Sequence, residues 1–217
     1  MITANFATHK ARTSTIDKAV QSIIDQVDIV RVHYNDYMPG ERKWEQYTGS
    51  DYTDRAKFAH VRAGEIAFTC DDDLEYPPDY VRTALNALSD YPDSLITFQG
   101  RVLLGAGRNY YRGHKKYRCL GSVERNVYVD VPGSGVSCFN AKHFFPNIMK
   151  YTENYMADLL LGLEARKRGI KVLCIKHPAG WINPIGEIDG AESVYVKMRN
   201  NQVELNRIAD KIYTMYR

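Results

Sequence analysis

The chain has 217 residues, a length that suits one domain, or one core with an appended element. Its net charge of +3 and its charged fraction of 25% are ordinary for a globular protein, so composition does not support a general polyanion-binding role. No stretch approaches the roughly 18 apolar residues of a membrane-spanning helix, and the first residues lack the long apolar run of a signal peptide, so we expect neither.

The cysteines favour a reducing compartment. They are widely spaced, and no two form a CxxC pair, so the sequence does not support a cysteine zinc site. We therefore expect a cytoplasmic protein with buried free thiols. The cysteines are Cys70, Cys119, Cys138 and Cys174.

The chain begins with a strand–loop–helix–strand pattern. Residues 1–6 predict a first strand, and residues 7–14 a polar loop. Residues 15–27 have apolar side chains at helical spacing, and residues 28–34 predict a second strand. This order is typical of the opening of a nucleotide-binding α/β unit. No GxGxxG motif is present, so dinucleotide binding of the usual type is not supported.

Three consecutive aspartates follow the next strand. Residues 35–50 are expected to be irregular and residues 51–62 to form a short helix; an apolar strand at 65–70 then leads directly into Asp71, Asp72 and Asp73. Open α/β sheets bind ligands at the carboxyl ends of their strands. Adjacent carboxylates repel one another, so the triplet is stable only if it is solvated or if a cation lies among its members.

A helix and a strand follow, and then an unusual basic segment. Pro77 and Pro78 begin a helix that ends near Tyr91, and residues 94–98 predict a strand. Residues 99–125 interleave basic side chains with tyrosine and glycine. One interpretation is a surface that grips phosphates or nucleic acid, and the other is a solvated, mobile excursion. The basic residues are Arg101, Arg108, Arg112, His114, Lys115, Lys116, Arg118 and Arg125.

The last part of the chain adds a small-residue turn and a strong helix. The sequence PGSG at 132–135 interrupts β-prone segments, and its small residues would let a backbone or a ligand approach closely. Residues 154–168 predict a helix that Gly169 caps, and residues 170–175 a strand. A C-terminal helix is expected over 192–216. We expect an α/β fold with a mixed, mainly parallel central sheet flanked by helices.

Three stretches of this sequence resemble one enzyme family. TCDDDLEYPPDYV resembles a DxD motif at a strand end, residues 5–32 resemble an opening nucleotide-binding unit, and MADLLLGLEARKRGIKV resembles an acidic residue leading a Leu-rich helix. Together they are similar to the GT-A (Rossmann-like) three-layer fold of nucleotide-sugar glycosyltransferases, particularly family-2-type inverting enzymes. The chain also resembles a glycosyltransferase domain encoded by chlorella viruses, which would place a viral protein in the host cytoplasm. The resemblance implies a GT-A domain over 1–190, with 191–217 packing on it or leading to a further domain.

The resemblance implies a metal-dependent, inverting transfer from a UDP-sugar donor to a glycan acceptor hydroxyl. Asp71 and Asp73 would hold Mn²⁺ or Mg²⁺, and Asp71 or Asp72 would bind the nucleotide. Which aspartate has which role stays open, because the triplet can be aligned with the DxD motif in two ways. Asp158 would be the general base that deprotonates the acceptor.

Further site residues follow from position in the family. Thr3, Ala4 and Asn5 would end the first strand and contact the base and ribose. The three residues expected near nucleotide or phosphate are Arg12, Asp36 and Lys57. His177 would bind metal or phosphate, or would be a structural histidine before a proline.

Two other functional classes remain open from sequence. A nucleotidyltransferase also combines an α/β fold with metal-binding carboxylates, but the Gly-rich, basic phosphate loop expected near its N-terminus is missing. A non-catalytic carbohydrate- or nucleic-acid-binding module would use the basic segment at 99–125. We expect no nucleic-acid partner because the chain as a whole is nearly neutral. The sequence does not indicate an oligomeric state.

Overall fold

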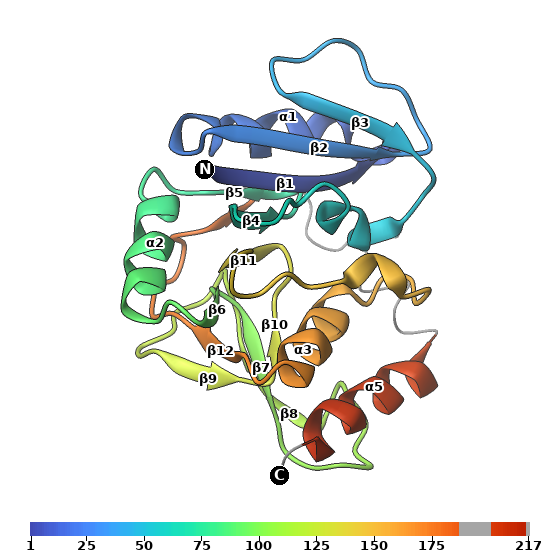
Figure 1. The fold of residues 1–217 in the computed structure, drawn as a ribbon, viewed down its shortest axis with the longest axis vertical. Coiled ribbons are helices and arrows are strands. Elements are labelled where there is room, and N and C mark those ends of the chain that lie inside the picture. The colour runs from blue at the N-terminus through green and yellow to red at the C-terminus, as the bar shows by residue number, and fades with distance from the viewer. Residues whose placement is uncertain (187–200, 216–217) are drawn as a thin grey trace.

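A mixed β-sheet runs through the protein (Figure 1). The computed structural model describes residues 1–186 and 201–215. Within them, the eight strands of this sheet lie in the order β3 (Glu45–Gly49), β2 (Ile29–Asn35), β1 (Ile2–His9), β4 (Ile66–Cys70), β11 (Val136–Asn140), β6 (Ser94–Thr97), β12 (Lys171–Cys174) and β9 (Val127–Val129).

Most neighbouring strands of this sheet are parallel. The pairs β3–β2, β2–β1, β1–β4 and β6–β12 are parallel, whereas β11 is antiparallel to both β4 and β6, and β9 is antiparallel to β12. The expected α/β class with a mixed, mainly parallel sheet is therefore confirmed, and the arrangement is compatible with a Rossmann-like fold.

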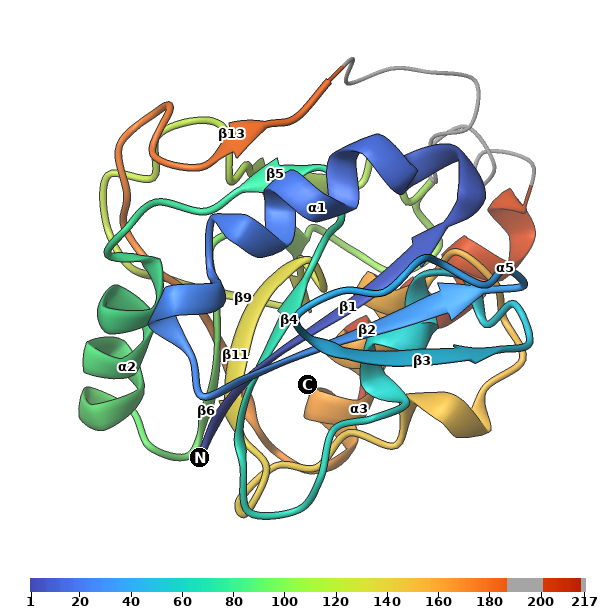
Figure 2. The same ribbon diagram turned by 90° about the horizontal axis from the view of Figure 1, so that it is seen from above.

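Helices cover both faces of the sheet, which gives three layers (Figure 2). The apolar sides of α1 (Thr13–Gln21) and α2 (Tyr80–Asp90) join one core cluster, and those of α3 (Ala157–Lys167) and α5 (Gln202–Thr214) join the other. Four 3₁₀ turns complete the described helical segments: η1 (Lys10–Arg12), η2 (Ile24–Gln26), η3 (Thr53–Phe58) and η4 (Ile148–Lys150). There are also two small sheets among the described residues. One has the strand order β10 (Val131–Pro132), β7 (Gly100–Leu103) and β8 (His114–Tyr117), and the other pairs β13 (Asn183–Pro184) with β5 (Leu74–Glu75).

Helix α3 is the most deeply embedded of these helices. Eight of its residues are buried, because it packs between the sheet, β10 and α5. Gly162 faces β10 so closely that an added Cβ would lie 2.8 Å from the Asp130 carbonyl oxygen. Gly169, at φ +68°, ends the helix in the left-handed conformation that glycine adopts without strain. Helix and cap agree with the sequence-based expectation.

The first strand is longer than its apolar run predicted. β1 extends to His9, because Ala7 and Thr8 continue the ladder with His33 and Tyr34 of β2. The predicted polar loop at 7–14 is therefore wrong: the strand, η1 and the start of α1 occupy it.

An edge strand and a hairpin were not predicted, because their sequences are largely polar. β3 lies within the stretch that was expected to be irregular, and its sequence EQYTG lacks apolar alternation because it borders the sheet on one side only. The basic segment at 99–125 contains the antiparallel pair β7–β8, a hairpin that the sequence did not predict. Residues 51–62 hold the 3₁₀ turn η3 where a short helix was expected.

The C-terminal helix packs on the core. Leu205, Ile208 and Ile212 of α5 are buried, and the Arg166 side chain of α3 donates a hydrogen bond to the Ile212 carbonyl oxygen at 3.0 Å. Residues 192–200 and 216 of the expected helix, and the expected domain boundary at 190, lie outside the described residues. None of the helices in the described part of the chain has the length and apolar character to span a membrane.

Candidate functional site

The carboxyl ends of β1, β2 and β4 meet at one edge of the sheet because these strands are parallel. The turn η1 with Arg12, the residue Asp36 and the aspartate triplet follow these three strands at that edge. β11 runs the other way, so the PGSG loop that precedes it also reaches this edge. Four segments far apart in sequence are thus brought together where a sheet of this kind binds ligands.

Asp71 lies directly over the PGSG loop. Its backbone N–H donates to the Gly135 carbonyl oxygen at 3.2 Å and to the Tyr76 hydroxyl at 2.8 Å. The Tyr76 hydroxyl in turn donates to the Gly135 carbonyl oxygen at 2.8 Å. A Cβ at position 135 would lie 1.8 Å from Asp71 Oδ2, so only glycine leaves room for this carboxylate. The expected close approach at the PGSG loop is realised by a side chain of the triplet.

The other two members of the triplet differ in their surroundings. Asp72 Oδ2 is buried with no hydrogen-bond partner among the described residues. Burial raises the pKa of Asp72 to about 6, against the opposing effects of the Thr8 hydroxyl and of the charges of Arg12 and Lys57. Burial, and then the charges of Asp71 and Asp72, raise the pKa of Asp73 to about 7. Asp72 and Asp73 therefore bind a proton more readily than an aspartate in water does.

Two basic side chains face the triplet. Lys57 of η3 is buried and forms an ion pair with Asp71, and Arg12 NH1 lies 3.2 Å from Asp73 Oδ2. Burial alone would lower the pKa of Lys57, but the charges of Asp71, Asp54 and Asp158 outweigh it and raise the pKa. Both residues were predicted near the nucleotide, and both lie at the triplet.

Asp158 stands on the other side of the PGSG loop, in the first turn of α3 as expected. Its Oδ1 accepts the Ser134 backbone N–H at 2.7 Å, and its Oδ2 accepts from Arg101 NH1 at 3.1 Å. Asp54 Oδ2 accepts the Ala157 backbone N–H at 3.0 Å and so satisfies the start of the same helix. Burial raises the pKa of Asp54 to about 6, and the negative charge of Asp158 contributes to that rise.

The PGSG loop therefore couples the two acidic centres. Gly135 accepts from Asp71, while its neighbour Ser134 donates to Asp158. Both acids also act on the pKa of Lys57, so the three charges share one electrostatic environment. The loop is the structural reason that residues nearly ninety positions apart lie at one site.

Sequence reasoning did not place Asp54 or Arg101 at the site, and it considered Ser134 only as part of the PGSG loop. Asp54 could have been found, since it precedes Lys57 by three residues and so shares its side of a helical turn. No local signal identifies Arg101 as the partner of Asp158, because the pairing depends on where the β7–β8 hairpin crosses α3.

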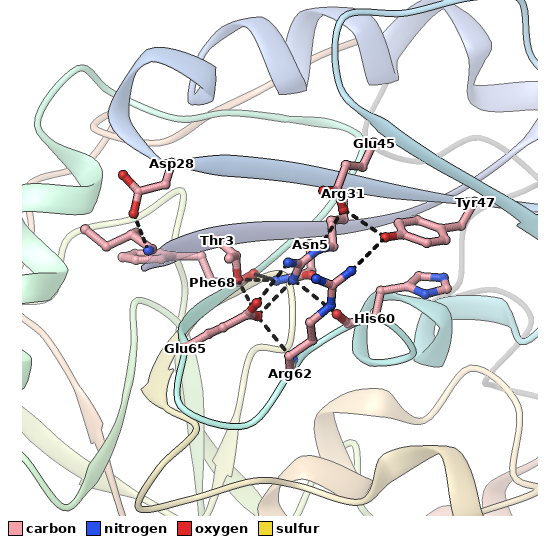
Figure 3. A network of polar contacts seen from close by, with 11 residues as sticks. Thr3, Asn5, Asp28, Arg31, Glu45, Tyr47, His60, Arg62, Glu65 and Phe68 are labelled. Atoms are coloured by element: carbon pink, nitrogen blue, oxygen red, sulfur yellow. Dashed lines mark hydrogen bonds and ion pairs between the residues drawn. The ribbon is translucent and has the colours of Figure 1, made fainter.

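Thr3, Ala4 and Asn5 lie elsewhere, so the prediction that they end the first strand is wrong. The strand continues to His9, which leaves all three buried in its first half. Figure 3 shows Thr3 and Asn5 pointing into a buried polar network around the Arg31–Glu65 ion pair. Thr3 Oγ1 donates to Glu65 Oε2 at 3.3 Å, and Asn5 Nδ2 donates to Thr3 Oγ1 at 3.1 Å. Their contacts are structural.

Asp36 and His177 follow strand ends but do not join the acidic centre. Asp36 is exposed after β2 and adopts a positive φ of 53°. His177 is buried after β12, where Nδ1 lies 2.8 Å from the Ile175 carbonyl oxygen and Nε2 lies 3.3 Å from that of Arg118. Both ring nitrogens lie beside backbone carbonyl oxygens, and the N–H of either tautomer can donate to one of them, which corresponds to the structural alternative for this histidine.

The triplet has the donor chemistry for a hard divalent cation. Within residues 1–186 and 201–215, no three His, Cys, Asp or Glu side chains converge as a ready-made metal site, because Asp71 and Asp73 each turn toward a basic side chain. Both carboxylates nevertheless keep exposed oxygens, and Asp72 Oδ2 has no partner. Carboxylate oxygens are the ligands that Mg²⁺ and Mn²⁺ prefer, so the residues present fit such an ion.

The fold and this edge define an α/β protein with an acidic, cation-flanked candidate site at the carboxyl ends of its parallel strands. No protein-family model matches the chain, and no curated protein matches it either.

Proposed function

We propose that this protein is a metal-dependent, inverting glycosyltransferase of the GT-A fold that transfers a sugar from a UDP-sugar to an acceptor hydroxyl. The observation that carries the proposal is the PGSG loop, whose residue Gly135 bonds Asp71 and whose residue Ser134 bonds Asp158. A transferase of this kind needs a diphosphate-binding centre and a base at one cleft. The loop contacts a candidate for each, Asp71 through Gly135 and Asp158 through Ser134.

The diphosphate end of the donor fits the triplet side of the site. Lys57 and Arg12 would bind its negative charges, and Asp71 and Asp73, freed from these pairs, would hold the divalent ion. When bound, that ion supplies Lewis-acid neutralisation of the leaving diphosphate. Asp72 would accept a hydrogen bond from the ribose.

Asp158 fits the role of general base. Each of its oxygens accepts one hydrogen bond and keeps further lone pairs, so one can take the proton of an acceptor hydroxyl. As that proton leaves, the acceptor oxygen bonds to the anomeric carbon while the bond to the diphosphate breaks on the opposite face. Arg101 and the Ser134 N–H hold the carboxylate in place. Attack from the opposite face inverts the anomeric configuration.

The two rival functions have less support. The turn after β1 has the sequence KAR and holds no glycine, unlike the phosphate loop that a nucleotidyltransferase would place there. A non-catalytic binding module would have no use for a carboxylate held in place as Asp158 is. No observation favours either rival over transfer.

The test is a comparison of donor binding with turnover in Asp158→Asn. We expect UDP affinity in the presence of Mn²⁺ to stay within about twofold of wild type, while transfer falls about 10²–10⁴-fold because the base is lost. The anomeric configuration of the wild-type product, read by NMR, should be opposite to that of the donor. Wild-type-like turnover in Asp158→Asn would remove Asp158 as the base, and a retained configuration would exclude the inverting mechanism.

A further inference from the structure

The β7–β8 hairpin carries a row of positive side chains on the face that meets Asp158. In the antiparallel ladder Arg101 lies opposite Lys116, so these two side chains project from the same face. Arg118 comes directly after the end of β8, and its charge acts on Lys116, whereas Lys115 projects from the other face of the strand. Arg101 is the member of the row that reaches Asp158, at 3.1 Å.

The outer part of this row is not neutralised. Lys116 and Arg118 are exposed, and across the described residues neither has an ion-pair partner. Partial burial, followed by the charges of Arg101 and Arg118, lowers the pKa of Lys116. A set of cations whose members repel one another is costly to the fold unless an anion joins it. Arg101, by contrast, is occupied by Asp158 and lies over the Tyr110 ring.

The row ends beside the candidate catalytic carboxylates. Burial raises the pKa of Cys119, the neighbour of Arg118, to about 12, and the charges of Asp71 and Asp158 contribute to that rise. The Arg118 backbone is held in place because its carbonyl oxygen lies 3.3 Å from Nε2 of the buried His177. The row thus lies within reach of the charges of Asp71 and Asp158, and its outer members, Lys116 and Arg118, remain open to solvent.

We propose that Lys116 and Arg118 bind an anionic group of the acceptor, a sugar carboxylate or a phosphate ester, and so place the acceptor hydroxyl at Asp158. This inference rests on the proposed glycosyl transfer and adds the chemical class of the acceptor. Under the proposed function, the diphosphate of the donor already has Lys57, Arg12 and the aspartate triplet as its partners. The unpaired cations of the row can bind an anionic group of the acceptor. The guanidinium of Arg118 carries a planar fork of N–H donors, which suits it to bidentate binding of a carboxylate or a phosphate.

The test uses three matched sugars that differ only at C6: methyl glucoside, methyl glucuronide and methyl glucoside 6-phosphate. Binding is measured by NMR titration, with and without UDP and Mn²⁺, for wild type, the double variant Lys116→Ala/Arg118→Ala, and Lys115→Ala as the control on the other face of the same strand. We expect wild type and Lys115→Ala to prefer one or both anionic sugars over methyl glucoside by about tenfold. The double variant should lose that preference and keep its UDP affinity. The more tightly bound anion identifies carboxylate or phosphate as the source.

Three results would overturn the inference: no anion preference in wild type, a preference that survives in the double variant, or an equal loss in Lys115→Ala. A loss of UDP affinity in the double variant would also overturn it, because it would assign the row to the donor. Failure of the proposed function gives a different pattern. Wild type would then not bind UDP with Mn²⁺, while the titration without UDP would still report on the row.

Discussion

Replacing Asp73 by asparagine should stabilise the ligand-free protein while removing its response to Mn²⁺. The pKa of Asp73 rises from 3.8 to about 7 because burial and the charges of Asp71 and Asp72 disfavour its ionised form. A folded carboxyl group with a raised pKa binds its proton more tightly than the unfolded chain does. Its contribution to stability is therefore lost as the pH rises from the unfolded value toward about 7.

The size of the effect follows from the shift and the exposure. About three pKa units correspond to roughly 4 kcal/mol in full. The Asp73 side chain is 37% exposed and its ion pair with Arg12 is lost in the variant, so solvent screening reduces the expected gain to about 1–2 kcal/mol. For a chain of this length that is a rise in Tm of about 3–6 °C at about pH 8, shrinking toward zero near pH 4.

The assay is thermal unfolding of wild type and Asp73→Asn across this pH range, with and without Mn²⁺ and UDP. Asp25→Asn, at an exposed carboxylate of η2, is the control and should change Tm little at any pH. Mn²⁺ with UDP should raise the Tm of wild type and of the control but not of Asp73→Asn. A variant no more stable than wild type at about pH 8, or a gain that does not depend on pH, would refute the electrostatic reasoning.

Two further substitutions separate the site from the scaffold. Gly135→Ala should weaken Mn²⁺-dependent UDP binding by about tenfold or more, because a Cβ there would collide with the Asp71 carboxylate. Gly40→Ala is the control, because a Cβ at position 40 has room and should leave UDP binding unchanged. Equal calorimetric affinities of the two variants for UDP would contradict the claim. Glu65→Gln should lower the free energy of unfolding in urea by about 3 kcal/mol, since it removes the buried partner of Arg31, and should leave UDP affinity per folded molecule unchanged. A shift in that affinity would place the buried network in the site.

The acidic triplet could be predicted from sequence because its signals are local. An apolar strand ends at Cys70, and the three aspartates follow it directly, where the chain turns. Asp158 was likewise predictable from a helix whose start and glycine cap are both encoded nearby. Where the sequence signals for a strand, a helix or a cap agree, both the type of element and its place in the chain can be predicted.

The errors arose where burial depends on distant partners. The end of β1 was set too early because Ala7 is small and Thr8 is polar, yet both lie in the ladder with β2. Thr3 and Asn5 then seemed available to a ligand, although Thr3 bonds to Glu65 and Asn5 bonds to Thr3 in the core. The same holds for Arg101, whose pairing with Asp158 depends on tertiary packing alone.

The most direct test of the central claim is calorimetric titration of UDP into wild type and Asp73→Ala, each with and without Mn²⁺. The proposed site predicts that Mn²⁺ strengthens UDP binding to wild type by at least about tenfold and does not strengthen binding to Asp73→Ala. An affinity of wild type for UDP that is the same with and without Mn²⁺ would contradict the claim that the aspartate triplet is a metal–diphosphate site.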